Sequence, residues 1–154
     1  MERLVQLLES KLQSKSGAEI DTAGTLQNKK IIGLYFSGHY CPPCRKFTPV
    51  LAEAYTKIRG DHDDFEIIFV SSDREEDQFK LYYEEMPWLA LPYSRRGIKS
   101  SLCVLFGVKI VPTLVFLNEQ GELLEAQGRR FVEDHAANPA EIRESLLSRK
   151  GTEP

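Results

Sequence analysis

Apolar residues occur in two patterns along this chain, one typical of helices and one typical of buried strands. At the N-terminal end they recur at helical spacing through residues 2–13, which predicts an amphipathic helix. The polar stretch 14–30 that follows predicts a short strand and a turn. Two compact apolar runs, IIGLYF at 31–36 and FEIIFVSS at 65–72, then predict buried strands.

The segments after these strands have helical patterns. Residues 46–60 predict a helix that ends near Gly60, and residues 74–86 predict a helix with a polar face. The apolar run LCVLFG at 102–107 predicts the end of another helix. A last helix is expected over Pro139–Arg149, because proline suits the first turn of a helix.

Residues 113–128 have the pattern of a hairpin, with an apolar strand, a turn around Asn118–Gly121 and a second strand. The strand–helix–strand order before it predicts two parallel strands with a right-handed crossover, and the hairpin adds antiparallel strands at one side. We therefore expect one α/β domain over 1–154, a central mixed β-sheet flanked by helices. It would carry an N-terminal helix and strand extension at about 1–30 and a C-terminal helix and tail at about 136–154.

Composition and charge exclude several classes of function. The net charge of −3 leaves no basic footprint for nucleic acid, and no apolar run approaches the length of a membrane span. The N-terminal segment carries charges throughout, so we expect no signal peptide. Three cysteines are too few for a secreted disulfide framework, so we expect a reducing compartment, the cytoplasm first and the nucleus second. We also expect a monomer.

The stretch GHYCPPCRKF at 38–47 places two cysteines two residues apart, where a helix begins after a buried strand. Unpaired backbone N–H groups and the helix dipole favour a thiolate at Cys41, and Arg45 and Lys46 add positive charge. Cys44 lies three residues on, so it can close a small disulfide ring with Cys41. The layout is an exposed nucleophile backed by a resolving thiol, as thiol–disulfide exchange requires.

Prolines accompany this motif. Pro42 and Pro43 stiffen the first helical turn, where missing N–H donors cost little. About seventy residues later, KIVPT at 109–113 puts Pro112 directly before a predicted strand. Together with the cysteines, this proline favours a cis bond between Val111 and Pro112.

Two other interpretations of the cysteine pair stay open. Zinc would need four ligands, so we expect no metal site, because the remaining candidates lack a finger-like spacing. These candidates are Cys103, His39, His62 and His135. Alternatively the two cysteines are structural thiols, since an isolated C-x-x-C motif also occurs by coincidence.

At this point the residues resemble the thioredoxin superfamily, and more narrowly its tryparedoxin and nucleoredoxin branch. The resemblance covers roughly residues 31–130 in order. It is carried by YFSGHYCPPCRKFTPVLAEAY, FEIIFVSSDREEDQF, MPWLALPY, LFGVKIVPTLVFL and GELLEAQGR. It implies a thioredoxin-like fold and the reduction of protein disulfides.

The resemblance also implies roles for the motif residues. Cys41 would be the attacking thiol and Cys44 the resolving thiol, with their disulfide as the only redox group and no other cofactor. Pro112 would be a cis-proline facing that disulfide, and the Val111 backbone would pair with an extended substrate segment. We expect the substrate surface to consist of Tyr40, Pro42, Pro43, Val111 and Pro112.

The partners expected from this resemblance are protein disulfides and an electron donor. Trypanothione, glutathione and a thioredoxin reductase all stay open as donors, that is, a low-molecular-weight thiol or a reductase. A second hypothesis is a redox-responsive protein-binding module, in which the oxidation state alters partner affinity and turnover is incidental.

The chain departs from the family pattern at three positions. The branch usually has tryptophan where this chain has Tyr40, and tryparedoxins tend to have tryptophan near Ser72. Ordinary thioredoxins carry a buried aspartate six residues before the first cysteine, where this chain has Tyr35. The proton acceptor for Cys44 is then expected to be water or a nearby carboxylate.

Other conspicuous residues have simple structural explanations. We expect His39 to be an exposed loop side chain, Cys103 to pack as a small hydrophobe, and Trp88 to lie in the core. The pair Arg129–Arg130 is expected to be solvated surface. Asp73 follows the second strand and is a candidate for shaping the rim of the site.

Overall fold

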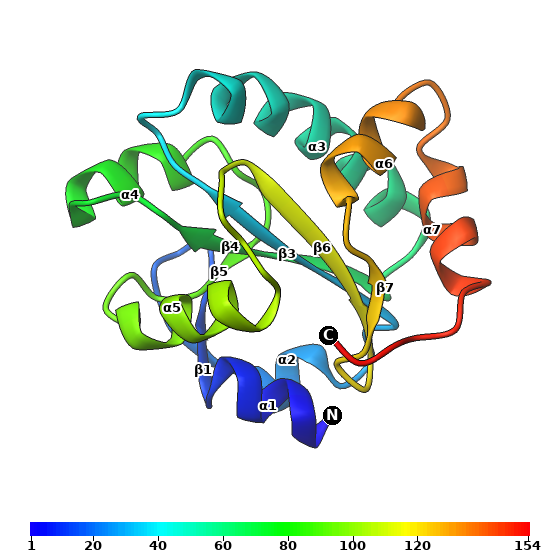
Figure 1. Cartoon of the computed structure of the whole chain (residues 1–154), viewed down its shortest axis with the longest axis horizontal. Helices are drawn as coiled ribbons and strands as arrows, with labels where there is room; N and C mark the ends of the chain where they lie inside the picture. Colours follow the sequence, from blue (N-terminus) through cyan, green and yellow to red (C-terminus); the bar gives the residue numbers. More distant parts are fainter.

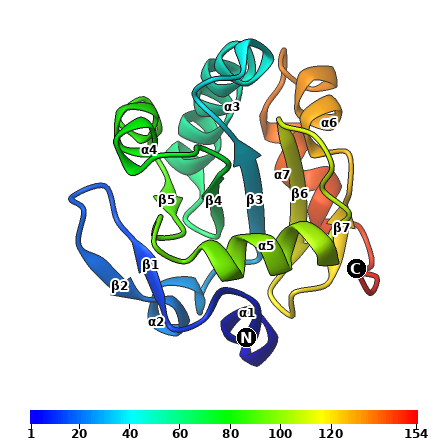
Figure 2. The same cartoon turned by 60° about the vertical axis from the view of Figure 1, so that its left-hand side comes forward.

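The computed structural model describes residues 1–154 and contains one mixed sheet of seven strands (Figure 1, Figure 2). The strands in spatial order are β2 (Glu19–Asp21), β1 (Lys11–Gln13), β5 (Leu89–Ala90), β4 (Phe65–Ser71), β3 (Ile31–Ser37), β6 (Thr113–Asn118) and β7 (Leu123–Glu125). Strand β4 runs parallel to both β3 and β5, and the other neighbours pair antiparallel. This is the expected mixed sheet, with the predicted parallel pair at its centre.

Helices cover both faces of the sheet, and each face has its own apolar core. One core lies under α3 (Pro42–Asp61), α4 (Glu76–Tyr83), α6 (Gly128–Asp134) and α7 (Ala140–Leu147). The opposite core lies under α1 (Glu2–Leu8), α2 (Thr22–Leu26) and α5 (Arg96–Leu105). Figure 2 shows α5 crossing its face of the sheet, with α3, α6 and α7 on the far side.

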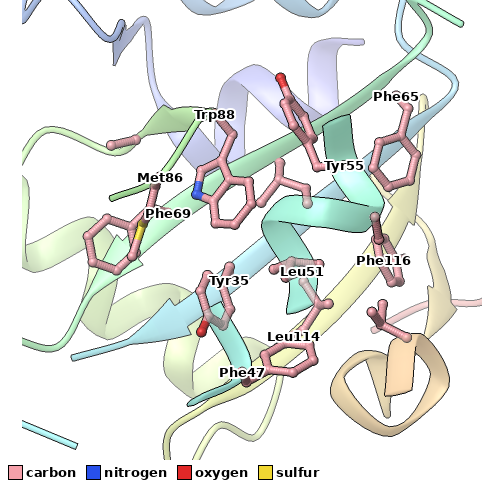
Figure 3. Close-up of a cluster of buried hydrophobic side chains, with 14 of the residues drawn as sticks. Tyr35, Phe47, Leu51, Tyr55, Phe65, Phe69, Met86, Trp88, Leu114 and Phe116 are labelled. Atoms are coloured by element: carbon pink, nitrogen blue, oxygen red, sulfur yellow. The ribbon is translucent and has the colours of Figure 1, made fainter. Parts of the chain in front are cut away.

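The central strands β3 and β4 are mostly apolar because both of their faces are covered. Successive side chains of β3 alternate between the two cores, so Tyr35 faces α3 while Leu34 and Phe36 face α5. Figure 3 shows the core on the α3 side. There the rings of Tyr35 and Trp88 pack edge to face, with their centroids 5.9 Å apart. Trp88 is 1% exposed, which confirms its predicted place in the core.

The prediction of one helix over residues 2–13 is wrong. Helix α1 ends at Leu8, where Glu9 adopts a positive φ of 59°, and Lys11–Gln13 forms β1 instead. Leu12 suits either interpretation of the pattern, because an apolar residue can be buried on a helix or on a strand, and in β1 its side chain is fully buried. Pairing of β1 with β2 and β5 decides for the strand.

Elsewhere the differences are mainly at the ends of elements. The helix expected from residue 46 begins at Pro42 and continues past Gly60 to Asp61. The stretch 14–30 contains α2 as well as β2, and Asp21 caps α2 by accepting a hydrogen bond from the Gly24 amide at 2.8 Å. Neither β5 nor α6 was predicted. The hairpin of β6 and β7 and the last helix, α7, lie where they were expected.

None of the seven helices combines the length and the apolar character needed to cross a membrane.

Strand pairing brings distant segments together at one end of the sheet. Strand β3 ends at Ser37, and β6 runs antiparallel to it with Thr113 opposite Phe36. The residues before Thr113 therefore lie beside the loop that follows Ser37. Both segments reach the start of α3, which in Figure 1 lies beyond the end of β3.

Candidate active site

Cys41 lies at the N-cap of α3, with its backbone extended and its sulfur turned toward the helix. The amide N–H of Cys44 donates a hydrogen bond to Cys41 Sγ at 3.3 Å, so the two thiols are adjacent. Pro42 and Pro43 occupy the first two helical positions, where an N–H would have no intrahelical partner. Both cysteines are free thiols; Cys41 is 8% exposed and Cys44 is fully buried.

The loop before β6 closes the other side of Cys41. The Val111–Pro112 peptide bond is cis, as expected from the sequence. The Cys41 thiol lies 3.6 Å from the carbonyl oxygen of Val111, to which it donates. The structure thus brings Cys41, Cys44 and Val111 together across 70 positions of sequence.

Tyr40 forms an exposed wall beside Cys41. Its side chain is 58% exposed, and burial of part of the ring raises the pKa of its hydroxyl. The ring lies over the backbone of Gly38, where a Cβ atom would come within 2.5 Å of it. A hollow of roughly 410 Å³ adjoins this ring, lined by Tyr40, Asp73, Arg74, Glu75 and Gln78.

Asp73 holds the loop that carries Cys41. Its carboxylate accepts hydrogen bonds from the His39 amide at 2.8 Å and from Ser71 Oγ at 2.8 Å. The Asp73 carbonyl accepts a third, from the Tyr93 hydroxyl at 2.8 Å. At 3% exposure the side chain lies behind the rim of the site and supports it from within. His39 is half-buried, with its ring 3.0 Å from Gln78 Oε1, so the expectation of an exposed loop side chain holds only in part.

Cys44 is buried in the α3-side core, where a few hydroxyl groups also approach it. Burial first, and the hydrogen bond with Cys41 second, raise the pKa of its thiol to about 11. Hydrogen bonds from the Ser37 side chain and the Gly38 backbone act in the opposite direction. Thr48 Oγ1 donates to the Cys44 carbonyl at 2.9 Å. Deprotonation of Cys44 is thus opposed by desolvation and favoured by neighbouring donors.

Ser37 and Thr48 belong to a cluster that was not predicted from the sequence. Four buried hydroxyl groups, defined here as the hydroxyl cluster, meet beside Cys44: those of Tyr35, Ser37, Thr48 and Tyr82. A partial signal was present, because residues 35 and 37 share one face of a strand, and residues 44 and 48 share one face of a helix. No pattern in the sequence indicated that Tyr82 of α4 would join these residues.

Residues predicted to lie outside the site behave as follows. Cys103 is half-buried against the α5-side core, and burial raises its pKa, as suits a small hydrophobe. Arg129 and Arg130 form pairs within α6 with Glu133 and Asp134, at 3.7 Å and 3.9 Å. They also line a groove of roughly 640 Å³ that reaches Pro112, so this pair borders the site more closely than expected.

No group of three or more His, Cys, Asp or Glu side chains is arranged to hold a metal ion.

Comparison with known proteins identifies the family. A family model described as thioredoxin-like matches residues 28–123, more than half of the chain. The chain belongs to the thioredoxin-like family. Human nucleoredoxin is 53% identical to this family member over 98 residues, which are 64% of the chain and 22% of that protein. Tryparedoxin of Trypanosoma brucei brucei is 46% identical over 125 residues, 80% of the chain and 84% of that protein.

A solved structure of tryparedoxin II complexed with glutathionylspermidine has a TM-score of 0.78 to this thioredoxin-like chain, at 34% sequence identity. The match covers 85% of this chain and 91% of that one. The fold is therefore thioredoxin-like, and the chain is similar to nucleoredoxin and tryparedoxin. The chain spans about a fifth of the length of the nucleoredoxins it matches.

Proposed function

We propose that this chain reduces disulfide bonds of proteins through a dithiol–disulfide couple of Cys41 and Cys44. The observation that carries the proposal is the position of Cys41 at the N-terminus of α3. Its sulfur accepts the Cys44 amide there and lies beside the Val111 carbonyl. A thiolate at that position is stabilised by a backbone donor and by the helix dipole.

In the proposed mechanism, the Cys41 thiolate attacks one sulfur of the substrate disulfide. A mixed disulfide forms, and the first substrate sulfur leaves as a thiolate. The Cys44 thiolate then attacks Cys41 Sγ, breaks the mixed disulfide and releases the second substrate thiol. The products are a substrate dithiol and the Cys41–Cys44 disulfide, with two electrons transferred and no cofactor beyond the two cysteines.

The substrate surface in this proposal surrounds Cys41. An extended substrate segment would pair with the Val111 backbone, beside Pro112. Tyr40, Pro42 and Pro43 present exposed ring surfaces on the other side of the sulfur. The donor that returns the couple to the dithiol state would be a low-molecular-weight thiol or a reductase. Support for the former comes from tryparedoxin II, which has been solved with glutathionylspermidine.

The decisive experiment is the reduction of insulin disulfides by dithiothreitol, with Cys44→Ser compared with the unchanged protein. We expect Cys44→Ser to lose turnover and to accumulate a mixed disulfide at Cys41, because the second attack has no thiol. Cys103→Ser is the matched control and is expected to turn over normally, since Cys103 packs on the opposite face of the sheet. Unchanged turnover in Cys44→Ser contradicts the two-cysteine mechanism.

A second candidate function is a redox-responsive binding module. The observation that favours it is the pKa of Cys44, raised to about 11 by burial, because a thiol that rarely ionises at neutral pH slows resolution. Affinity capture with the reduced and the oxidised protein separates the two functions. A partner that binds only one oxidation state, together with absent insulin turnover, supports the module and overturns the reductase.

A further inference from the structure

The hydroxyl cluster occupies the region behind Cys44, on the side away from solvent. Its oxygens come from three elements, β3, α3 and α4, and form a closed ring. Around the ring, the distances are 2.7 Å from Tyr35 to Thr48, 2.6 Å from Thr48 to Tyr82, 2.7 Å from Tyr82 to Ser37 and 3.2 Å from Ser37 to Tyr35. All four side chains are at most 2% exposed.

The ring is joined to the turn that carries Cys44. Thr48 Oγ1 lies 2.9 Å from the Cys44 carbonyl oxygen, and the Tyr35 hydroxyl lies 3.4 Å from the same atom. The four hydroxyls thus have six hydrogen-bond contacts, four within the ring and two to the Cys44 carbonyl, but only four protons to donate. Because a hydroxyl both donates and accepts and its proton can rotate, the cluster can accept a hydrogen bond from a neighbour or donate one.

The two tyrosines in the ring stay neutral. Burial raises the pKa of Tyr35 far above its usual range, and burial also raises the pKa of Tyr82. The cluster therefore interacts with Cys44 through hydrogen bonds, and it does not act as a charged base. Figure 3 shows the Tyr35 ring within the core, with its oxygen directed away from Trp88.

Buried carboxylates elsewhere in the protein are held by other partners, and that of Glu66 accepts hydrogen bonds from the Tyr55 hydroxyl and the Ile67 amide. The titratable groups that influence Cys44 or are influenced by it are Cys41, Tyr40 and Tyr82. The buried carboxylate of Asp73 is engaged by His39 and Ser71. On its own helix Cys44 is followed by Arg45 and Lys46, which are exposed.

Resting on the proposed function, we propose that the hydroxyl cluster controls ionisation of the resolving thiol and replaces a buried carboxylate in that task. Ser37 accepts a hydrogen bond from the Cys44 thiol and then rotates to donate one to the thiolate, while its ring partners hold the Ser37 hydroxyl and the Cys44 carbonyl in place. They are positioning residues for the second step, in which Cys44 attacks Cys41 Sγ. The proton lost by Cys44 is balanced by the one the leaving substrate thiolate takes up, and the hydroxyls keep theirs.

The test uses 5,5′-dithiobis(2-nitrobenzoic acid) in stopped flow, with Cys103→Ser as the background for every variant. Attack by Cys41 releases a first coloured thiolate, and resolution by Cys44 releases a second, so each cysteine has its own phase. Because burial raises the pKa of the Cys44 thiol, the second phase should accelerate with rising pH between about pH 6 and 9, by up to about tenfold per pH unit.

Thr48 offers a matched pair of substitutions. Thr48→Val removes the hydroxyl and keeps the shape, whereas Thr48→Ser keeps the hydroxyl and removes a methyl group. We expect Thr48→Val to slow the second phase about tenfold at every pH, as a rise of one pKa unit would, with the first phase unchanged. Thr48→Ser should match the background protein, although its packing is the more disturbed of the two.

Two adjacent tyrosines give a second, independent comparison. Tyr82→Phe removes a ring hydroxyl, and we expect the same slowing of the second phase. Tyr83→Phe removes the neighbouring buried hydroxyl, which donates to the Trp88 carbonyl and lies outside the cluster, and should leave both phases unchanged.

Equal second phases in Thr48→Val, Tyr82→Phe and the background protein overturn the cluster's role. Equal slowing of the second phase in Thr48→Val and Thr48→Ser also overturns it, because the loss of rate would then come from altered packing. Absence of any second phase in the background protein is a different result, because it overturns the two-cysteine reductase itself.

Discussion

At the scale of single residues, the surface next to Cys41 depends on one glycine. Gly38 has no side chain, so the Tyr40 ring lies over its backbone, where a Cβ atom would come within 2.5 Å. The Tyr40 ring can occupy this position only because Gly38 lacks a Cβ atom. This contact makes the two positions interdependent, because a larger residue at 38 must displace the ring.

Gly38→Ala is therefore expected to weaken substrate binding more than thiol reactivity. We expect the KM for insulin to rise by roughly fivefold, the equivalent of about 1 kcal/mol of lost contact with the ring. The rate at which Cys41 reacts with a small disulfide should change little. Gly97→Ala is the control, because a Cβ there meets nothing within 4 Å. An unchanged KM in Gly38→Ala would show that the ring does not contact substrate.

At the scale of elements, helix α6 packs directly on the backbone of β6. The contact is made at Gly128, the first residue of α6, where a Cβ atom would lie 2.4 Å from the Leu114 carbonyl oxygen and 2.7 Å from Leu114 Cγ. This close approach places α6 over the strand that begins just after Pro112. The sequence pattern contained no helical signal here, since the helix is short and begins with glycine.

Gly128→Ala should destabilise the fold by roughly 1–3 kcal/mol, because α6 must move off β6 to admit the methyl group. Urea unfolding followed by circular dichroism measures this change. In the control, Gly60→Ala, a Cβ has open space within helix α3, and we expect a gain of up to about 1 kcal/mol from the better helix former. Equal stabilities of the two variants would mean that α6 is not held by this contact.

At the scale of the whole molecule, one ion pair ties the C-terminal helix to the start of β4. Arg143 on α7 donates through Nε and Nη2 to the two carboxylate oxygens of Asp64, at 2.9 Å and 2.7 Å. The two side chains are 11% and 12% exposed, and 79 positions separate them in sequence. Such a bidentate, largely buried pair is worth more than an exposed one.

The pair makes the stability of the fold depend on pH. Hydrogen bonds from Arg143 lower the pKa of Asp64 below 3.8 in the folded protein. The associated stability is fully present above the unfolded-state pKa and is lost as the pH falls through the folded-state pKa. We expect Asp64→Asn to cost about 2–3 kcal/mol at pH 7, and the difference from the unchanged protein to narrow below about pH 4.

Urea unfolding at neutral and acid pH measures both effects. Glu144→Gln is the control, because Glu144 contacts the same guanidinium at 2.9 Å but is 67% exposed, so its loss should cost under about 1 kcal/mol. If Asp64→Asn lowers the free energy of unfolding equally at pH 3 and pH 7, the Asp64–Arg143 pair is not the source of this pH dependence.

The sequence by itself determined those features that depend on neighbouring residues. The continuous apolar runs at 31–36 and 65–72 predicted β3 and β4, because a strand buried on both faces has no polar side. The thiol pair and the position of Pro112 before a strand located the candidate site, since both lie in short motifs whose geometry is local.

Tertiary structure decided what depends on contacts between distant segments. Leu12 suits a helix and a strand equally, and only pairing with β2 and β5 settles the choice. The hydroxyl cluster joins residues up to 47 positions apart on three elements, so no local pattern contains it. Helical and strand periodicities arise from neighbouring residues, whereas the environment of Cys44 arises from side chains that meet only after the sheet and its helices have packed.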